Sequence, residues 1–145
     1  MADPLVIIGA AASVVSIIDV LARSISTVRE LRDQWKDADF TILNLVAQLT
    51  ALKAALTKIK EWTDTELAEA HHQLIMDIDD SVACCRILVG KVDTLLSELQ
   101  QKPNGTLDWL ARAKLLLGSK SMDDLQKMIE RQTCALTLLL TACNL

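Results

Sequence analysis

The sequence predicts an all-α protein, folded as an up-and-down bundle of four to five helices. Aliphatic residues recur at alternating three- and four-residue intervals in successive segments, which is the spacing of one face of an α-helix. No segment shows the strict apolar–polar alternation of a half-buried strand. Hydrophobic residues make up 51% of the chain and aromatic residues 3%, so we expect an aliphatic core. A chain of 145 residues fits one domain, and residues 1–145 are predicted to form a single bundle.

The N-terminal run, residues 4–21, is the longest nearly uncharged stretch, and Asp19 is its only ionisable side chain. Asp3 followed by Pro4 predicts a helix start, because Asp caps free backbone N–H groups and Pro fits the first helical position. A helix through this run has an apolar face formed by Ile7, Ala11, Val14, Ile18 and Leu21. The flanks that widen this face are Leu5, Ile8, Val15 and Ile17. Small side chains gather on the other side: Gly9, Ala12, Ser13 and Ser16.

Two interpretations of this helix remain open. It fits a buried core helix, and it also fits a membrane span, since Gly9 and Ser13 have the four-residue spacing that lets helices approach closely in a bilayer. Residues 4–22 would span ~28 Å, close to a hydrocarbon core of ~30 Å. Asp19, near one end, would cost less than the ~3 kcal/mol of an Asp at mid-membrane. A helix buried at rest and released to a membrane joins the two interpretations.

The next elements follow from the same periodicity. The first helical pattern continues through Leu31 toward Trp35, and serines at 24 and 26 leave one long helix or two possible. A second helix is predicted from about Asp39 to Trp62. Thr63 and Glu66 then have the spacing of a capping box, which predicts the start of a third helix that runs to about Gln101 and is the longest of the domain.

Two apolar stripes predict that the third helix packs against two neighbours. The first stripe is Leu74, Ile78, Ser81, Cys85, Leu88, Val92, Leu95 and Leu99, and the second is Ile75, Val82, Val89 and Leu96. After Lys102–Gly105 breaks the pattern, a short helix is predicted over Leu107–Leu117, closed by Gly118. Ser119 or Ser121 caps the last helix, whose predicted core residues are Met122, Leu125, Ile129, Gln132, Leu136, Leu139 and Cys143.

The polar residues form no convincing active site. Asp77, Asp79 and Asp80 suggest either metal binding or an exposed acidic face, and the second is favoured because no further ligands lie nearby in the sequence. His71 and His72 are adjacent and point ~100° apart on a helix, so they cannot chelate one ion together. We therefore expect no enzyme, no metal and no cofactor.

Charge and aromatic content argue against nucleic acid as a partner. The net charge is −4, and the chain has one Phe and no Tyr to stack on bases. Three tryptophans, Trp35, Trp62 and Trp109, fall near predicted helix ends, where they either close the ends of the bundle or anchor at a membrane or partner surface.

Cysteine usage and the N-terminus predict a cytoplasmic protein at rest. Cys84, Cys85, Cys134 and Cys143 all fall in helical patterns without CxxC spacing, as expected for reduced thiols in a helical core. The N-terminal run lacks the basic region of a signal peptide. The chain stops without a helix-terminating signal, so we expect this domain to be the N-terminal module of a longer protein.

The opening residues Met1-Ala2-Asp3-Pro4-Leu5, followed by an aliphatic helix rich in alanine and serine, resemble the N-terminal domains of fungal STAND (NOD-like) receptors, the HeLo-like family. The segment with Trp109 and Lys114 before the last helix, and the Leu/Thr-rich ending 136–142, are similar to the same family. Such domains look like relatives of the HeLo domain of fungal incompatibility proteins and, more distantly, of the four-helix bundle of the necroptosis pseudokinase MLKL.

The resemblance implies an effector of regulated cell death that clusters on activation, exposes its first helix and permeabilises the plasma membrane. Its partners would be membrane lipids after activation, further copies of itself, and a C-terminal receptor or signalling module on the same or a partner protein. The alternative is a homotypic oligomerisation or adaptor domain of a receptor, without direct action on lipid. The implied membrane-inserting residues are Leu5, Val6, Ile7, Ile8, Gly9, Val14, Val15, Ile17, Ile18, Val20 and Leu21, and the helix-packing residues are Gly9, Ser13 and Ser16.

Overall fold

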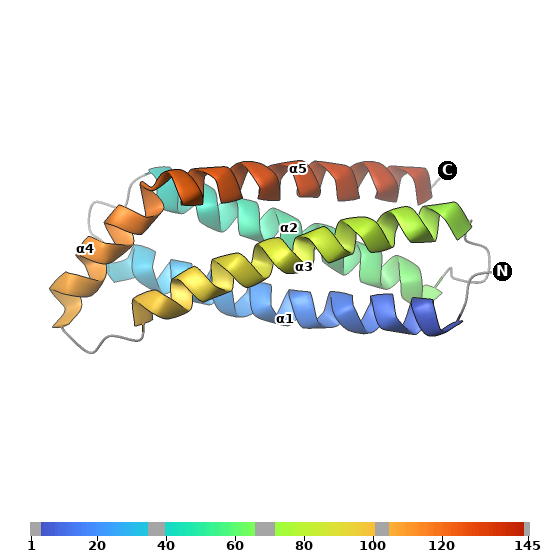
Figure 1. Ribbon diagram of the computed structural model, residues 1–145, viewed down its shortest axis with the longest axis horizontal. Coiled ribbons are helices and arrows are strands. Elements are labelled where there is room, and N and C mark those ends of the chain that lie inside the picture. The colour runs from blue at the N-terminus through green and yellow to red at the C-terminus, as the bar shows by residue number, and fades with distance from the viewer. Residues whose placement is uncertain (1–3, 35–39, 66–71, 101–104, 144–145) are drawn as a thin grey trace.

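The computed structural model describes residues 4–34, 40–65, 72–100 and 105–143 of the chain, and in these ranges it is helical with no strand (Figure 1). The predicted all-α class is confirmed. The helices are α1 (Pro4–Gln34), α2 (Phe40–Thr65), α3 (His72–Gln100), α4 (Gly105–Leu117) and α5 (Lys120–Cys143).

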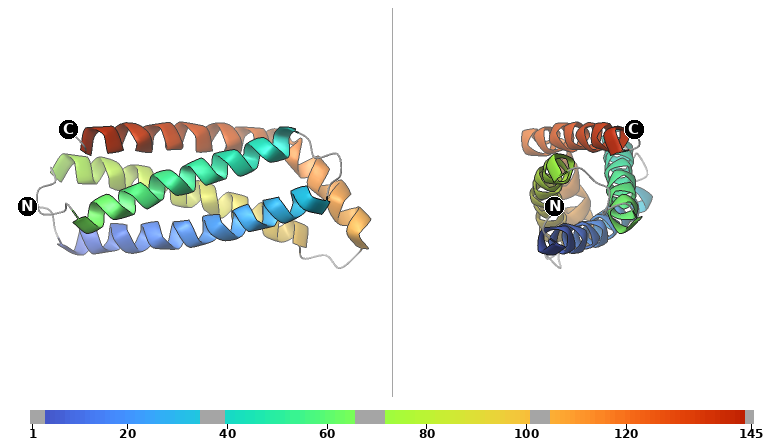
Figure 2. Two further views of the ribbon diagram at one scale, coloured as in Figure 1. Left: turned by 180° about the vertical axis from the view of Figure 1, so that it is seen from behind. Right: turned by 90° about the vertical axis from the view of Figure 1, so that its right-hand side faces the viewer.

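The four long helices form a square bundle, and the short helix α4 crosses one end of it against α3 and α5 (Figures 1 and 2). The long helices alternate in direction along the chain, as the up-and-down prediction requires. Their order around the square is α1, α2, α5, α3, so α2 and α3 occupy opposite corners although they follow one another in the sequence. Consequently α1 packs antiparallel to α2 and parallel to α3, and α5 packs antiparallel to α3 and parallel to α2.

The core is aliphatic, as the composition predicted. On α2 the residues predicted to face inward are all fully buried: Ile42, Leu45, Leu49, Leu52, Leu56 and Ile59. On α3 both predicted stripes are buried except Leu74 and Leu95, which are half-buried. Each fully buried Val, Leu or Ile side chain among them contributes about 1.5–3 kcal/mol by leaving water, before the loss of chain entropy is subtracted.

The predicted start of α3 is wrong. Thr63 lies inside α2, where its Oγ1 donates a hydrogen bond to the Lys60 carbonyl oxygen at 2.8 Å, and it is buried. A hydroxyl that bonds back to its own helix cannot cap the next one, so the Thr63–Glu66 capping box does not form as predicted; Glu66 itself lies outside the described residues. The described part of α3 has 29 residues and α1 has 31, so α3 is not the longest described helix.

The boundary between α4 and α5 agrees with the sequence. Gly118 donates its N–H to the Lys114 carbonyl oxygen at 3.1 Å, as expected of a residue that closes a helix. Of the two predicted caps for α5, Ser119 is the one used, because its Oγ accepts the Met122 N–H at 3.2 Å. Asp123 in the first turn is paired with Lys127 at 3.1 Å. The two serines in α1, at 24 and 26, do not interrupt that helix.

Candidate functional site

The candidate site is α1, and its described side chains begin at Ser13. From there the helix buries a single apolar stripe against α2 and α3, which consists of Val14, Ile17, Leu21, Ile25, Val28 and Leu31. Two predicted positions exchange roles within it. Ile17, expected on a flank, is fully buried, and Ile18, expected at the centre of the face, is half-buried, because the core lies slightly to one side of the face expected from the sequence.

The outer side of α1 between residues 13 and 22 is small, apolar or neutral apart from one carboxylate. Val15 is 40% exposed, and Ser16, Asp19 and Ala22 are exposed beside it. Asp19 has no ion-pair or hydrogen-bond partner among the described residues. This side of the helix would therefore lose few polar contacts if it moved to an apolar environment.

Several predicted site residues lie outside the described side chains. These are Leu5, Val6, Ile7, Ile8 and Gly9, of which the structure gives only the helical backbone of α1. Among the remaining predicted inserting residues, Val20 is half-buried. Ser13 is half-buried and Ser16 is exposed, so Ser16 makes no close helix contact within this bundle, and its role in packing against another copy stays a prediction.

One polar group in the packed stripe has no partner. Ser24 is 2% exposed, and its Oγ has no hydrogen-bond partner among the described residues. Burial of an unpaired hydroxyl costs about 1–3 kcal/mol. Ser24 therefore weakens the docking of α1 midway along the helix.

Two of the three acidic residues of α3 are exposed, as the favoured interpretation predicted. Asp77 and Asp80 are exposed and Asp79 is half-buried, and Asp77 accepts a hydrogen bond from Gln73 at 3.0 Å. Within the described ranges, no group of three or more His, Cys, Asp or Glu side chains could hold a metal ion. The side chains of His71 and His72 lie outside what the structure describes.

The cysteines of the described chain are free thiols in different environments. Cys85 is buried, and burial, with a smaller contribution from neighbouring Cys84, raises the pKa of its thiol to about 12. Cys84 is half-buried and Cys134 is exposed. A thiol that stays protonated at neutral pH is a poor nucleophile, so Cys85 fits a packing role.

Trp62 is the one tryptophan whose side chain the structure describes. It is buried near the C-terminal end of α2, as the end-closing interpretation predicted. Trp35 and Trp109 lie outside the described side chains.

Sequence reasoning missed an exposed surface on the side of the bundle that α3 and α5 form together. Ile87 of α3 is 58% exposed and Met128 of α5 is 47% exposed, and both border a groove of about 670 Å³ that opens onto this surface. The signal was present in the sequence, because Ile87 falls outside both buried stripes of α3.

By length and composition, one helix in the described ranges could cross a membrane, and it is α2, over Phe40–Asp64. The core helix of a soluble bundle passes the same test, and the inward side of α2 is fully buried here. Comparison with known proteins adds no relative: no protein-family model, no curated protein and no solved structure matches this chain.

Proposed function

We propose that this domain is a membrane-permeabilising effector of fungal regulated cell death or heterokaryon incompatibility. It rests in the cytoplasm as a helical bundle, clusters when a C-terminal receptor or signalling module activates it, and releases the N-terminal part of α1 into the plasma membrane. Lipid and further copies of the domain are its partners, and nucleic acid is not.

The observation that carries the proposal is the nearly uncharged outer side of α1 over residues 13–22. A released helix must exchange its inner contacts for lipid and must also bring its outer side into lipid. Here the outer side offers Val15, Ser16 and Ala22, and Asp19 is the single group whose charge must be desolvated or kept at the bilayer surface. The resemblance of the opening residues to HeLo-like domains supports the same proposal.

Release of α1 requires an energy source. Freeing Val14, Ile17 and Leu21 exposes three buried side chains, at about 1.5–3 kcal/mol each. Lipid restores that apolar environment, and clustering raises the local concentration of released helices. The bundle is therefore expected to act only where membrane and several copies are present together.

The test is dye release from liposomes of plasma-membrane-like composition. Val15→Asp adds a charge to the outer side of the uncharged run without touching the core, and we expect it to abolish leakage. Ser26→Asp is the matched control, because residue 26 is exposed and lies on the same side of α1, three turns further along. It should leak like the unmodified domain.

Both variants must show unchanged helicity and thermal stability by circular dichroism. Leakage that survives Val15→Asp would refute the inserting-helix proposal. Point variants are preferable to deletion of residues 1–22, since that deletion removes Val14, Ile17 and Leu21 from the core.

A second candidate is an assembly adaptor that transmits receptor clustering without touching lipid. The exposed Ile87 and Met128 favour it, because apolar side chains that flank a surface groove are typical of a protein contact. An adaptor predicts a defined oligomer in solution and no leakage at any protein concentration.

A further inference from the structure

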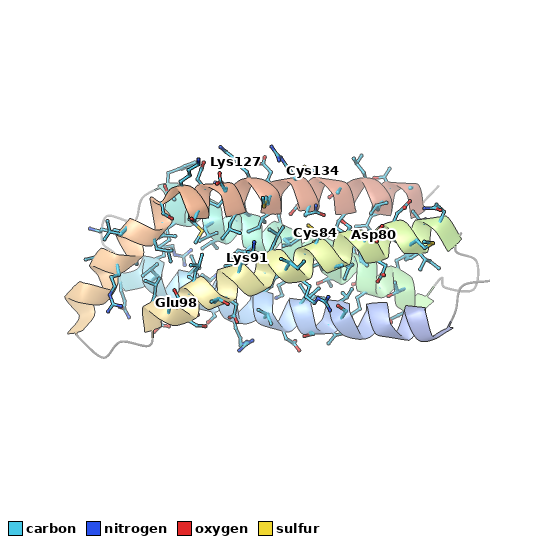
Figure 3. All side chains as sticks on the ribbon, viewed as in Figure 1. Asp80, Cys84, Lys91, Glu98, Lys127 and Cys134 are labelled. Atoms are coloured by element: carbon cyan, nitrogen blue, oxygen red, sulfur yellow. The ribbon has the colours of Figure 1, made fainter. Side chains whose placement is uncertain are left out.

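The side of the bundle formed by α3 and α5 is a surface with a regular chemical order. We call it the α3–α5 face and define it by Asp80, Cys84, Ile87 and Lys91 on α3 and Asp124, Met128 and Arg131 on α5. Figure 3 shows Asp80, Cys84 and Lys91 following one another along α3, with α5 beside it. All seven residues are exposed except Cys84, which is half-buried.

On each helix, the residues that define the α3–α5 face begin with an acid, continue with one or two apolar side chains and end with a base. On α3 the order is Asp80, then Cys84 and Ile87, then Lys91; on α5 it is Asp124, Met128 and Arg131. The spacing alternates three and four residues on both helices, so each set lies on one side of its helix. None of the four charged side chains has an ion-pair partner among the described residues.

The two sets share one centre. Ser81 donates a hydrogen bond to Gln132 Oε1 at 2.9 Å, which places these two residues at the same level of the antiparallel pair. On α3, the midpoint between Asp80 and Lys91 lies about four and a half residues after Ser81 along the chain. On α5, the midpoint between Asp124 and Arg131 lies the same number of residues before Gln132. Because the helices run in opposite directions, the two midpoints coincide in level.

We propose that the α3–α5 face is the contact between two copies of this chain. A two-fold axis that lies in the plane of the contact, passes through the shared centre and crosses both helices at right angles lays α3 antiparallel on α3 of the second copy and α5 antiparallel on α5. It sets Asp80 opposite Lys91 of the second copy and Asp124 opposite Arg131 of the second copy, with each pair made twice. Ile87 then meets Cys84 of the second copy, and Met128 lies next to the axis.

We choose a second copy of the chain as the partner because the charge pattern of the α3–α5 face is complementary to itself. One symmetry axis satisfies all four unpaired charges and covers both exposed apolar side chains, and an unrelated partner would have to supply a matching pattern. The groove beside Ile87 and Met128 opens onto the surface, so it offers little enclosure to a small ligand. The face is two helices wide with a charged rim, which places it among the smaller protein contacts and predicts reversible, concentration-dependent association.

This inference rests on the proposed function because the contact between two copies would provide the clustering that the proposed function requires. It is tested by molecular mass in solution without lipid, whereas the proposed function is tested by leakage, so the failure of one is distinguishable from the failure of the other.

The experiment is sedimentation equilibrium of the full domain over a concentration series, with four variants. The unmodified domain should move from 15.9 kDa toward twice that mass as concentration rises. Lys91→Asp places two like-charged pairs in each dimer and should weaken association about tenfold or more. Combining it with Asp80→Lys restores both pairs and should bring association back to within about threefold of the unmodified domain. Raising the salt concentration should weaken the unmodified dimer.

The control is Arg29→Glu, which changes the net charge by the same amount on an exposed position of α1, and it should associate like the unmodified domain. The fourth variant, Asp80→Lys alone, should be as weak as Lys91→Asp. A domain that stays monomeric up to about 1 mM, or single variants that associate normally, would overturn the proposal. So would a double variant as weak as the single ones, since α3 would then not face α3 of the second copy.

Discussion

Within α1, residues 13–22 and residues 23–34 bury equivalent aliphatic side chains but expose different ones. Each half contributes three residues to the core: Val14, Ile17 and Leu21 in the first half and Ile25, Val28 and Leu31 in the second. The exposed charged residues of the second half are Arg23, Arg29, Glu30 and Asp33, whereas the first half exposes only Asp19. The inner faces show that both halves belong to the folded bundle, and the outer faces differ in the number of charges that they expose, one against four.

The largest expected effect tests whether the two inner faces are equivalent. Leu21→Ala and Leu31→Ala each remove a fully buried side chain, and each should lower the free energy of unfolding by about 2–5 kcal/mol, measured by urea denaturation. If Leu21→Ala lowered the free energy of unfolding by less than about 1 kcal/mol while Leu31→Ala had the full effect, the two inner faces would not be equivalent. The first half would then be only loosely docked.

The second prediction sharpens the difference between the outer faces. Asp19→Asn removes the one charge of the first half, and we expect the rate of dye release to rise up to about tenfold, because about 1.4 kcal/mol of insertion cost is removed. Glu30→Gln is the matched control, because residue 30 is exposed and lies on the same side of α1, three turns further along. Equal effects of the two changes would show that net charge, and not the position of the charge, controls leakage.

A smaller effect is expected where the halves meet. Ser24→Ala removes the buried hydroxyl without a partner and should raise the free energy of unfolding by about 1 kcal/mol. The control is Ser26→Ala, an exposed position on the same helix, where only helix propensity changes, by about 0.5 kcal/mol or less. If docked α1 limits release, Ser24→Ala should also slow leakage; a destabilised Ser24→Ala variant would show that the hydroxyl has a partner after all.

The smallest effect tests whether the core that both halves of α1 help to form excludes water from Cys85 of α3. The pKa of Cys85 is raised from 9.0 to about 12, so the unfolded chain loses this proton first as pH rises. The free energy of unfolding is therefore unaffected by this thiol well below pH 9 and falls as the pH rises from 9 to 12. At pH 9.5 the expected loss is about 0.8 kcal/mol. Urea denaturation at pH 8 and 9.5, compared with Cys85→Ala, isolates this loss. A Cys85→Ala variant with the same pH dependence would place the Cys85 thiol in contact with water.

Periodicity predicted the helices and most of the core because burial repeats with the helical turn. It failed at the end of α2, where Thr63 has the side chain of a cap but satisfies its hydroxyl on the Lys60 carbonyl of its own helix. No local pattern distinguishes those two partners, since both are available to a threonine near a helix end.

The order of the helices around the square could not be read from the sequence. Two apolar stripes on α3 predicted two neighbours but not their identity, and the structure shows that they are α1 and α5, with α2 at the opposite corner. For the same reason the α3–α5 face was missed, because residues such as Ile87 and Met128 acquire a shared surface only when the two helices are known to be adjacent. In α1 the sequence pattern put Val15 and Ile17 together on the flanks of the apolar face, although the structure exposes Val15 and buries Ile17.

The square arrangement has a consequence for exchange of helices between molecules. A bundle that had lost α1 would keep the contacts of α5 with α2 and with α3, and the inner faces of these helices would line a trough one helix wide with α5 as its floor. An α1 from another molecule carries the same stripe from Val14 to Leu31 and would make the same contacts in that trough. Domain swapping of this kind would need no new interface, because the exchanged helix would replace an identical one.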